Sequence, residues 1–472
     1  MARFKDRPRK VGDNRDGHNA HPGGVQGIAH THSPAQFSDT FEGAQVRFYE
    51  ILCGYTLRPP VLAIIRSFLK KWKRVKDRSS QRVCYPSVRR GKRGWRRPYA
   101  TLVNGMPLVP PYIEALRPYE AGRNAEEIQR EYGVTRVSKL ASNENPLGTS
   151  PLALQAIART MGSLHLYPSG GLGLRRVLAE KFDLKTENVI AGSGSEGIMS
   201  GLIRTFLCDE DEVLTTEAAF IGFQVLAKSR GVKYRTVPYR DWHYDLAALA
   251  REINDRTKIV YLANPNNPTG TIFTKHEFDD FYRHVPERVL IILDEAYFEY
   301  AQDNPRYPDS MHYRYDNVIT LRTFSKIYGL AGVRIGYGFA HEDLIANLLK
   351  VKLPFEPSTL AEAAGIAALT DKEFLHRSLE LNARGLKFLT NAVREMGLTV
   401  VPSEANFVMT VLPGAQQAAQ LNRELLAQGI IVRPLTSFGL PNCIRISTGT
   451  DEDNQRCVEA MQKSEVIAVC KS

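Results

Sequence analysis

The sequence predicts an α/β protein with a mostly parallel central sheet that helices cover on both faces. Short apolar runs rich in β-branched residues alternate with helix-like segments from about residue 106 onward, and polar or glycine-rich residues follow these runs directly. Strands separated by helices form parallel sheets with both faces covered, and such sheets bind ligands at the carboxyl ends of their strands. The predicted strands are 188–191, 212–215, 258–262, 289–293 and 317–321.

Charge divides the chain into two unlike parts. The 472 residues include 62 Lys or Arg and 51 Asp or Glu, which gives a formal net charge of +11. Residues 51–100 contain 15 basic residues and a single acid, Asp77, whereas residues 101–472 contain 40 basic and 44 acidic residues. The basic character therefore belongs to one segment, and the body of the protein does not indicate a nucleic-acid partner.

Residues 1–105 are expected to form a basic, disordered extension. The first forty are rich in Gly, His, Pro, Asn and Asp and lack apolar periodicity, which is typical of disorder. Residues 64–72 predict one short amphipathic helix, and residues 89–97 form a basic run broken by glycine. One interpretation of this run is a tether to nucleic acid or to an acidic membrane. The favoured interpretation is a solvated tail, or translated sequence that is not part of the working protein, with Met106 as the hypothesised functional start.

Membrane insertion, secretion and metal binding are not predicted. No apolar run approaches the ~18 residues of a spanning helix, and the apolar cluster at 61–65 is too short and too far along the chain for a secretory signal. The six cysteines lie far apart and form no C-x-x-C pair, so neither a zinc site nor a disulfide framework is indicated. We expect a protein of the reducing cytoplasm.

Phosphate binding is predicted after the first strand. The turn over 193–197 leads into a helical stretch at 198–206. Backbone N–H groups at the start of a helix have no partner within the helix and favour anions, so Gly194, Ser195 and Glu196 are candidate phosphate-binding residues. The alternative is a purely structural turn, because glycine-rich turns are common between strands and helices.

Two further strands end in polar residues that suit a cofactor ring. The strand 258–262 leads into a rigid turn with three asparagines, of which Asn267 is a candidate donor to a ligand oxygen. The strand 289–293 runs into Asp294, and Tyr297 follows three residues later. A carboxylate at the end of a buried strand needs a partner. A helix N-cap would give it a structural role, and a protonated ring nitrogen would give it a functional one.

The strand 317–321 leads to the candidate nucleophile. Lys326 lies between this strand and an apolar segment punctuated by glycines, where solvated lysines are unusual. Burial among polar cofactor groups would make its amine a usable nucleophile. Thr323 precedes it, and Arg334 lies in a similarly apolar context. A phosphate would suit the planar fork of this arginine.

These five features together describe pyridoxal phosphate (PLP). A carboxylate keeps the ring nitrogen protonated, so that the ring can accept electrons from the substrate α-carbon. The matching residues are Gly194, Ser195, Glu196, Thr323 and Arg334 for the phosphate, Asp294 for the ring nitrogen, Asn267 and Tyr297 for the phenolic oxygen, and Lys326 for the aldehyde. Each feature alone has a structural explanation, but all five in this order indicate one cofactor.

At these residues the sequence resembles the fold-type I aminotransferases, and within them the histidinol-phosphate aminotransferase family, over about residues 106–464. The segment 142–148 resembles the family's N-terminal signature, and 165–168 resembles its tyrosine-proline motif. The resemblance implies an N-terminal arm with part of the small domain at 106–150. It also implies a large PLP-binding domain at 151–355 and a small α+β domain at 356–472.

The resemblance implies roles for residues outside the five features. Tyr167 would reach the cofactor phosphate of the partner subunit, which implies a homodimer with shared active sites. Phe220 would stack on the pyridine ring, with Phe223 as the fallback. The implied substrate-binding residues are Tyr119, Asn143, Arg433 and Arg445, of which the two arginines would bind substrate anions.

The implied reaction moves an amino group between glutamate or 2-oxoglutarate and imidazole-acetol phosphate or L-histidinol phosphate, in histidine biosynthesis. An aromatic amino acid aminotransferase of the same subfamily is one alternative, and a PLP-dependent decarboxylase is another. A regulator with a DNA-binding module would need two or three helices in residues 1–105, which predict at most one.

Two departures from the family's pattern lie outside the core of lysine, aspartate and arginine. Ser195-Glu196-Gly197 replaces the more common Asp and then Glu, and Ala218-Ala219 replaces a proline-containing approach to the stacking aromatic. We expect phosphate binding by the backbone to survive both changes.

Overall fold

The computed structural model describes residues 108–116, 118, 122–313 and 315–471. These residues belong to one compact unit, Arg97–Ser472. The predicted extension, the proposed start at Met106 and the candidate substrate residue Tyr119 lie outside the described residues. The predicted domain boundaries near residues 150 and 355 stay predictions.

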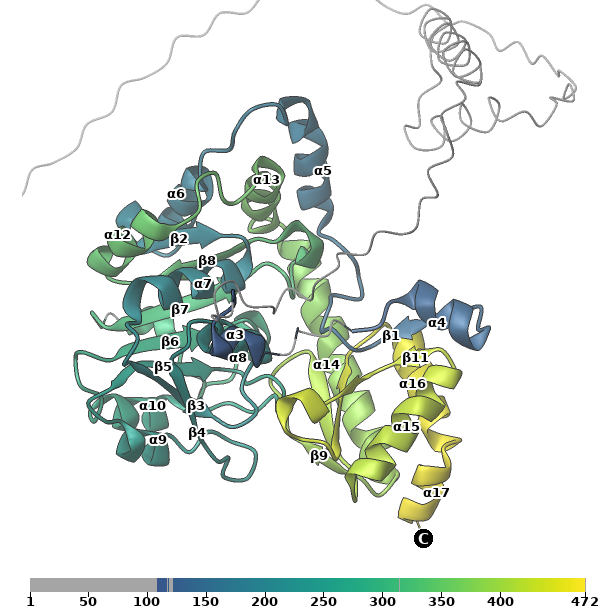
Figure 1. The fold of residues 1–472 in the computed structure, drawn as a ribbon. Helices are drawn as coiled ribbons and strands as arrows, with labels where there is room; N and C mark the ends of the chain where they lie inside the picture. Colours follow the sequence, from purple (N-terminus) through teal and green to yellow (C-terminus); the bar gives the residue numbers. More distant parts are fainter. Residues whose placement is uncertain (1–107, 117, 119–121, 314, 472) are drawn as a thin grey trace, which may run out of the picture. The chain divides into compact units, whose positions relative to one another are not determined.

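A seven-stranded sheet carries the features that the sequence singled out (Figure 1). Its order is β2-β8-β7-β6-β5-β3-β4, and β8 alone runs antiparallel to its neighbours. The strands are β2 (Val189–Gly192), β3 (Glu212–Thr216), β4 (Lys233–Val237), β5 (Thr257–Ala263), β6 (Leu290–Asp294), β7 (Val318–Thr323) and β8 (Gly336–Phe339). The predicted fold class, a mostly parallel sheet, is confirmed.

Helices cover both faces of this sheet, as Figure 1 shows. One face packs against α7 (Gly194–Phe206), α8 (Ile221–Ser229) and α12 (Glu342–Val351). The other packs against α6 (Leu172–Lys181), α9 (Leu246–Glu252), α10 (Lys275–Tyr282) and α13 (Thr359–Ala368), and α5 (Pro151–Thr160) lies beside α13. Along β5 the side chains alternate, so that Tyr261 faces α7 and α8 whereas Val260 faces α9 and α10.

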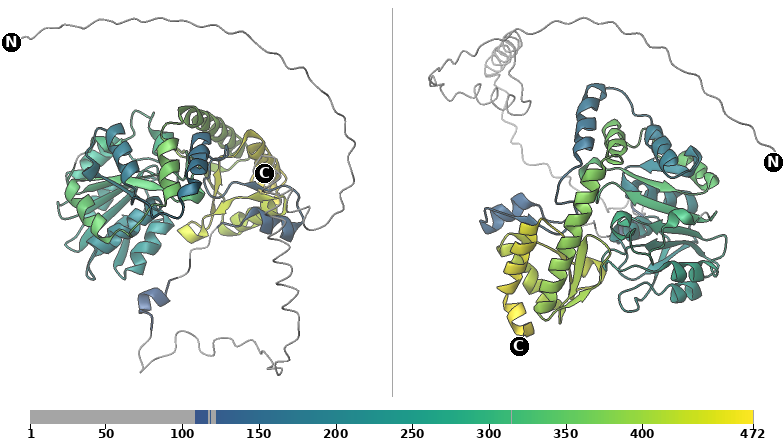
Figure 2. Two further views of the ribbon diagram at one scale, coloured as in Figure 1. Left: turned by 90° about the horizontal axis from the view of Figure 1, so that it is seen from above. Right: turned by 180° about the vertical axis from the view of Figure 1, so that it is seen from behind.

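A second, four-stranded antiparallel sheet follows in the C-terminal part of the chain. Its order is β12 (Arg433–Pro434), β13 (Cys443–Ser447), β10 (Phe407–Val411) and β9 (Thr399–Val401). The 24-residue helix α14 (Lys372–Glu395), seen as the long green helix in the right view of Figure 2, packs on it with α15 (Ala415–Ala427) and α16 (Asp451–Gln462). These helices and strands share one apolar core, which the side chains of Leu389, Leu421 and Ile444 help to fill.

The remaining elements are short and join distant parts of the chain. The N-terminal strand β1 (Ser138–Lys139) pairs in parallel with β11 (Ile430–Ile431). The other helices are α3 (Pro111–Glu114), α4 (Ala125–Tyr132), α11 (Phe298–Ala301) and α17 (Glu465–Lys471), with 3-10 turns at 161–163, 186–188, 310–312, 331–333 and 436–438. Among the described residues, we find no helix that is long and apolar enough to cross a membrane.

Two strands of the large sheet were not predicted. In β4 only Val237 is buried, so its sequence lacks the continuous apolar run of an inner strand. In β8 two of the four residues are glycines, and Gly336 and Gly338 lie against the backbone of neighbouring segments. A search for runs of apolar, β-branched residues therefore misses both strands: β4 is a partly exposed edge strand, and the glycines of β8 allow close packing.

Candidate active site

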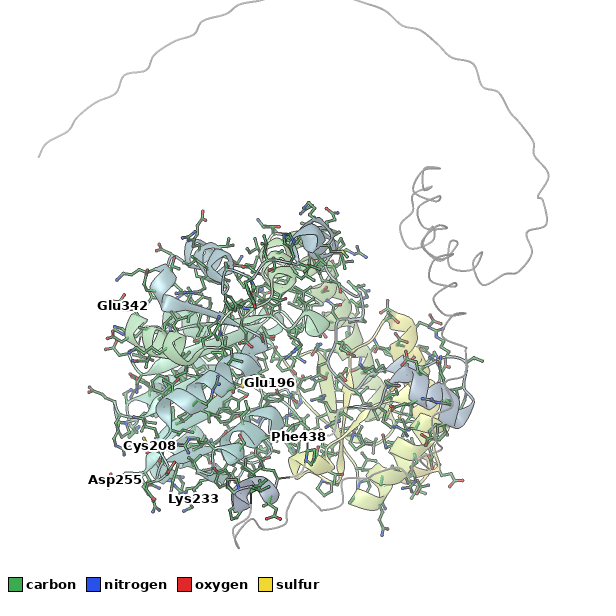
Figure 3. All side chains as sticks on the ribbon, turned by 45° about the horizontal axis from the view of Figure 1, so that its top comes forward. Glu196, Cys208, Lys233, Asp255, Glu342 and Phe438 are labelled. Carbon is green, nitrogen blue, oxygen red and sulfur yellow. The ribbon has the colours of Figure 1, made fainter. Side chains whose placement is uncertain are left out.

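A cavity that is open to solvent lies at the carboxyl ends of the parallel strands. Its lining residues follow β2, β3, β5, β6 and β7, as the rule for ligand sites in such sheets predicts. They are Ser195, Glu196, Phe220, Ala263, Asn267, Asp294, Ala296, Tyr297, Thr323, Ser325, Lys326 and Arg334. Glu196, which is labelled in Figure 3, lies in the first turn of α7. The structure therefore brings together nine of the residues that the sequence predicted around the cofactor.

The start of α7 and the residues around it form a site for an anion. No side chain caps this helix at Ser193, and Gly194 at its first position has a φ of +76°. A Cβ atom on Gly194 would lie 2.8 Å from Nη2 of Arg334, so glycine lets the guanidinium approach the turn. Arg334 donates to the Ser325 hydroxyl at 3.3 Å and pairs with Glu196 at 3.4 Å. A phosphate would meet N–H groups, a hydroxyl and a guanidinium here.

Gly336 is the residue on which the shape of this turn depends. A Cβ atom at this position would lie 2.4 Å from the backbone nitrogen of Ser195 and 2.6 Å from the carbonyl carbon of Gly194. We expect Gly336→Ala to displace the turn and to raise the dissociation constant of PLP at least about tenfold, a loss of ~1.4 kcal/mol. A titration of the apoprotein with PLP, followed by absorbance, measures this.

Gly332→Ala is the matched control for Gly336→Ala. Gly332 belongs to the same glycine-rich segment, but a Cβ atom there would meet nothing within 4 Å. We expect this variant to bind PLP as the wild type does. Equal affinities of the two variants would contradict the assignment of the turn as the phosphate site.

Asp294 ends β6 and points into the cavity with one unpaired oxygen. Its Oδ2 accepts a hydrogen bond of 2.6 Å from the Tyr261 hydroxyl. Its Oδ1 is buried and has no hydrogen-bond partner among the described residues. Burial raises the pKa of this carboxyl group to about 6. A buried carboxylate oxygen of this kind requires a donor or a cation, and a protonated ring nitrogen would supply both.

Lys326 lies beside hydrogen bonds made by residues of the segment 142–148, the N-terminal signature. Its Nζ donates to the main-chain oxygen of Ser142 at 3.4 Å and lies 5.6 Å from the ring centroid of Tyr297. The side chain of Asn143 donates to the Tyr297 hydroxyl at 2.8 Å and accepts from the Ser447 hydroxyl at 2.7 Å. Asn143, predicted to bind substrate, thus also holds Tyr297 at the cavity.

The two arginines predicted to bind anions face each other in the small sheet. The register of β12 and β13 pairs Arg433 directly with Arg445, so the two side chains lie on the same face. Arg445 is buried, donates to the carbonyl of Ala141 at 2.7 Å and contacts the side-chain oxygen of Asn267. This contact joins the small sheet to the cavity.

Two aromatic residues lie away from the cavity. Tyr167 is 80% exposed and stacks on Phe355 with a centroid separation of 4.2 Å. Phe223, the fallback for the stacking aromatic, is buried in the core and stacks on Tyr261 at 4.0 Å. Phe220 lines the cavity instead.

Four groups that contact residues of the site were not assigned from the sequence. They are the hydroxyls of Ser325, Tyr261 and Ser447 and the carbonyl of Ser142. Ser325 could have been found, because it precedes Lys326 directly in the motif. Tyr261 and Ser447 carry no local signal, since each lies within an apolar strand.

The donors and acceptors of the cavity fit PLP. An anion site, an unpaired carboxylate oxygen, a tyrosine hydroxyl and a lysine amine lie around one space. These are the groups that its phosphate, ring nitrogen, phenolic oxygen and aldehyde require. Among the described residues, no group of three or more His, Cys, Asp or Glu side chains could hold a metal ion.

Comparisons with known proteins agree with this arrangement. Residues 135–461 match the family model described as aminotransferase class I and II. The chain is 44% identical to a histidinol-phosphate aminotransferase of Anaeromyxobacter sp. (strain Fw109-5), over 75% of this chain and 98% of that protein. A crystal structure of histidinol-phosphate aminotransferase from Sinorhizobium meliloti, in complex with pyridoxal-5'-phosphate, superposes with a TM-score of 0.69 at 30% identity and covers 78% of this chain and 99% of that one. Aspartate aminotransferase from Thermus thermophilus, at 22% identity and a TM-score of 0.66, covers 75% of this chain and 99% of that one, and shares the fold.

Proposed function

Because the chain belongs to the class I and II aminotransferases, and within them to the histidinol-phosphate aminotransferases, we propose that it transfers an amino group from glutamate to imidazole-acetol phosphate. The products are 2-oxoglutarate and L-histidinol phosphate. The observation that carries this assignment is the pair Arg433 and Arg445, of which Arg445 contacts the cavity residue Asn267. Two cations suit the two carboxylates of glutamate and the doubly charged phosphate of the other substrate.

The cofactor is PLP, which when bound supplies an aldehyde for the amino group and a protonated ring that accepts electrons from the substrate α-carbon. Ser195, Thr323 and Arg334 would hold its phosphate, and Phe220 would lie against its ring. Asp294 would keep the proton on the ring nitrogen, because its Oδ1 is buried and has no hydrogen-bond partner among the described residues. Tyr297, fixed by Asn143, would donate to the phenolic oxygen.

Lys326 moves the proton in each half of the reaction. In the first half its amine would take the proton from the substrate α-carbon and deliver it to C4′ of the cofactor, and in the second half it would move a proton in the opposite direction, so one group would serve as base and then as acid. Arg445 orients the substrate through its anion, and Asn267 orients Arg445. Because the donor's product leaves before the acceptor binds, ping-pong kinetics are expected.

Substrate competition tests the assignment. With glutamate as the donor, we expect kcat/KM for imidazole-acetol phosphate to exceed that for phenylpyruvate at least about a hundredfold. Phenylpyruvate lacks the phosphate, so the groups that bind this phosphate would stay unpaired in its transition state. Arg433→Ala should lower kcat/KM for the phosphorylated acceptor by about tenfold or more and change that for phenylpyruvate less. Equal or better use of phenylpyruvate by the wild type would favour the aromatic aminotransferase. Release of carbon dioxide from the donor would favour the decarboxylase.

We also propose a homodimer in which Tyr167 serves the partner's site. Tyr167 stacks on Phe355. The segments 154–166 and 353–355 expose large apolar side chains: Leu154, Met161, Leu164, Leu166, Leu353 and Phe355 are each at least half exposed. Such a surface is characteristic of a protein interface. Tyr167 does not line the cavity of its own chain, which agrees with a role in a second copy. The cytoplasmic location stays a prediction.

Mixed dimers test this arrangement. Lys326→Ala and Tyr167→Ala subunits are each expected to be poorly active alone. Reassembled together, a hybrid has one site with both native residues, so activity should rise to about a quarter of the wild type for random pairing. An activity no higher than the mean of the two parent variants would place Tyr167 in its own site or outside both.

A further inference from the structure

The carboxylate of Asp294 is held by a residue that lies outside the cavity. Tyr261 is fully buried in β5, does not line the cavity, and donates to Oδ2 of Asp294 at 2.6 Å. The other oxygen, Oδ1, has no partner among the described residues. The hydrogen bond from Tyr261 therefore holds Oδ2, while Oδ1 stays available to a ligand in the cavity.

The register of the sheet places this hydroxyl. β5 and β6 pair in parallel, with Ala263 opposite Asp294. Tyr261 lies two residues before Ala263 and projects from the same face, so it is a diagonal neighbour of Asp294, at a separation that an aromatic side chain can bridge. Only a long side chain with a terminal donor at this position could reach the carboxylate.

The tyrosine ring itself has little freedom. It stacks on Phe223 of α8 with centroids 4.0 Å apart and an interplanar angle of 11°. The main-chain oxygen of Tyr261 accepts a hydrogen bond of 2.6 Å from the Thr215 hydroxyl in the neighbouring segment. Stacking of this kind fixes the ring plane, and the hydroxyl can therefore set the orientation of the carboxylate.

The direction of the hydrogen bond is also fixed. Burial, together with the nearby Asp294, raises the pKa of Tyr261 well above its ordinary value, so the phenol keeps its proton. Asp294 is then always the acceptor. Burial raises the pKa of Asp294, while the hydrogen bond from Tyr261 lowers it, as does the charge of Lys326. Removing the phenol would make the neutral carboxyl group more prevalent near pH 7.

We propose that Tyr261 is a positioning residue for transamination: its hydroxyl orients the Asp294 carboxylate so that the second oxygen meets the ring nitrogen of PLP. This inference rests on the proposed function only in its use of PLP, and not on the identity of the amino acceptor. A carboxylate held in this way stays charged and needs no reorientation when the cofactor binds. Phe223 has the supporting role of holding the tyrosine ring.

Tyr261→Phe tests the proposal, since it removes one oxygen and keeps the stacked ring. We expect the rate of the half-reaction with glutamate to fall about tenfold and the dissociation constant of PLP for the apoprotein to rise several-fold. PLP affinity is expected to fall at acidic pH, where Asp294 becomes neutral, and in Tyr261→Phe this fall should begin at a higher pH. We call the pH at which it begins the acidic limit of PLP affinity. The other groups that act on Asp294, namely the main-chain N–H of Ala296 and the side chains of Tyr244, Lys326 and Glu196, are the same in both proteins.

A double-mutant cycle separates positioning from a general effect on the fold. In an Asp294→Asn background, Tyr261→Phe should change the rate and the PLP affinity by less than about twofold, because the charged carboxylate that the hydroxyl orients toward the ring nitrogen is gone. Tyr307→Phe is the matched control: this buried phenol donates to the main-chain oxygen of Asn264 and not to Asp294. We expect it to leave the acidic limit of PLP affinity unchanged.

Two outcomes would overturn the proposal. Either Tyr261→Phe matches the wild type in rate and PLP affinity, or its losses persist undiminished in the Asp294→Asn background. These results are distinct from a failure of the proposed function, in which the wild-type protein would bind PLP and react with glutamate but would not use imidazole-acetol phosphate.

Discussion

Lys326→Ala is expected to lower the turnover number for transamination by at least about a thousandfold. The variant loses the amine that transfers the proton, a contribution of 10²–10⁴-fold in comparable enzymes, and also the nucleophile that engages the cofactor. PLP should still bind, more weakly, because the anion site and Asp294 remain. Stopped-flow absorbance of the bound cofactor after addition of glutamate measures the loss, and the mixture should show no rapid change.

Lys326→Arg tests whether the reaction needs the amine of Lys326 or only its positive charge. Arginine keeps a positive charge but does not lose its proton in proteins, so it cannot act as a base here. We expect it to be as inactive as the alanine variant. Melting temperatures near that of the wild type would show that both proteins are folded. A turnover number within tenfold of the wild type for either variant would remove Lys326 from the proton transfer.

Arg322→Ala is expected to cost about 3–5 kcal/mol of stability, the usual effect of breaking a buried ion pair. Arg322 in β7 is 1% exposed and donates to Glu295 and Asp309, each at 2.9 Å. Its guanidinium also lies 3.3 Å from the ring centroid of Phe298. The alanine variant would leave the carboxylates of Glu295 and Asp309 without this cation. Urea denaturation of the apoprotein measures the change.

The pH dependence of this loss has a definite sign. Burial raises the pKa of Glu299 to about 7 and that of Glu295 in the same direction, while the charge of Arg322 lowers both. A carboxyl group whose pKa is higher in the folded state binds more protons there, so it makes the protein less stable as pH rises from about 4.5 to about 7. Without Arg322 these pKa values rise further. The destabilisation by Arg322→Ala should therefore be smaller at pH 5 than at pH 8.

A double variant provides the control for Arg322. Arg322→Met combined with Glu295→Gln removes both charges and keeps most of the volume, so it should be more stable than Arg322→Ala. If the double variant is no more stable than Arg322→Ala, the unpaired charge of Glu295 is not the source of the cost.

Much of the fold and of the cavity could be predicted from the sequence. The strands β2, β3, β5, β6 and β7 lie within two residues of their predicted bounds. They are recognisable because buried parallel strands are continuously apolar. The cavity residues that follow them could be found for the same reason: a short polar motif directly after such a strand has to lie at the sheet's carboxyl edge.

The relations between distant residues could not be predicted. Asn143 stays a predicted substrate-binding residue, and only the structure shows that its side chain also holds Tyr297 and Ser447. Phe220 and Phe223 are three residues apart, and only the packing of α8 shows that one lines the cavity while the other supports Tyr261. The antiparallel β8 was missed because its glycines serve close packing and carry no apolar signal.

The sequence by itself determined the class of fold, the cofactor chemistry and the lysine, aspartate and arginine that suit it. Each of these follows from a contiguous motif, whose residue types and order along the chain are local properties. Only the tertiary structure decided that Arg433 faces Arg445, that Tyr261 reaches Asp294 and that Arg322 is buried among carboxylates. The physical reason is that strand register and helix packing set these contacts between separate segments, and a shift by one residue would turn every side chain of a strand to the other face.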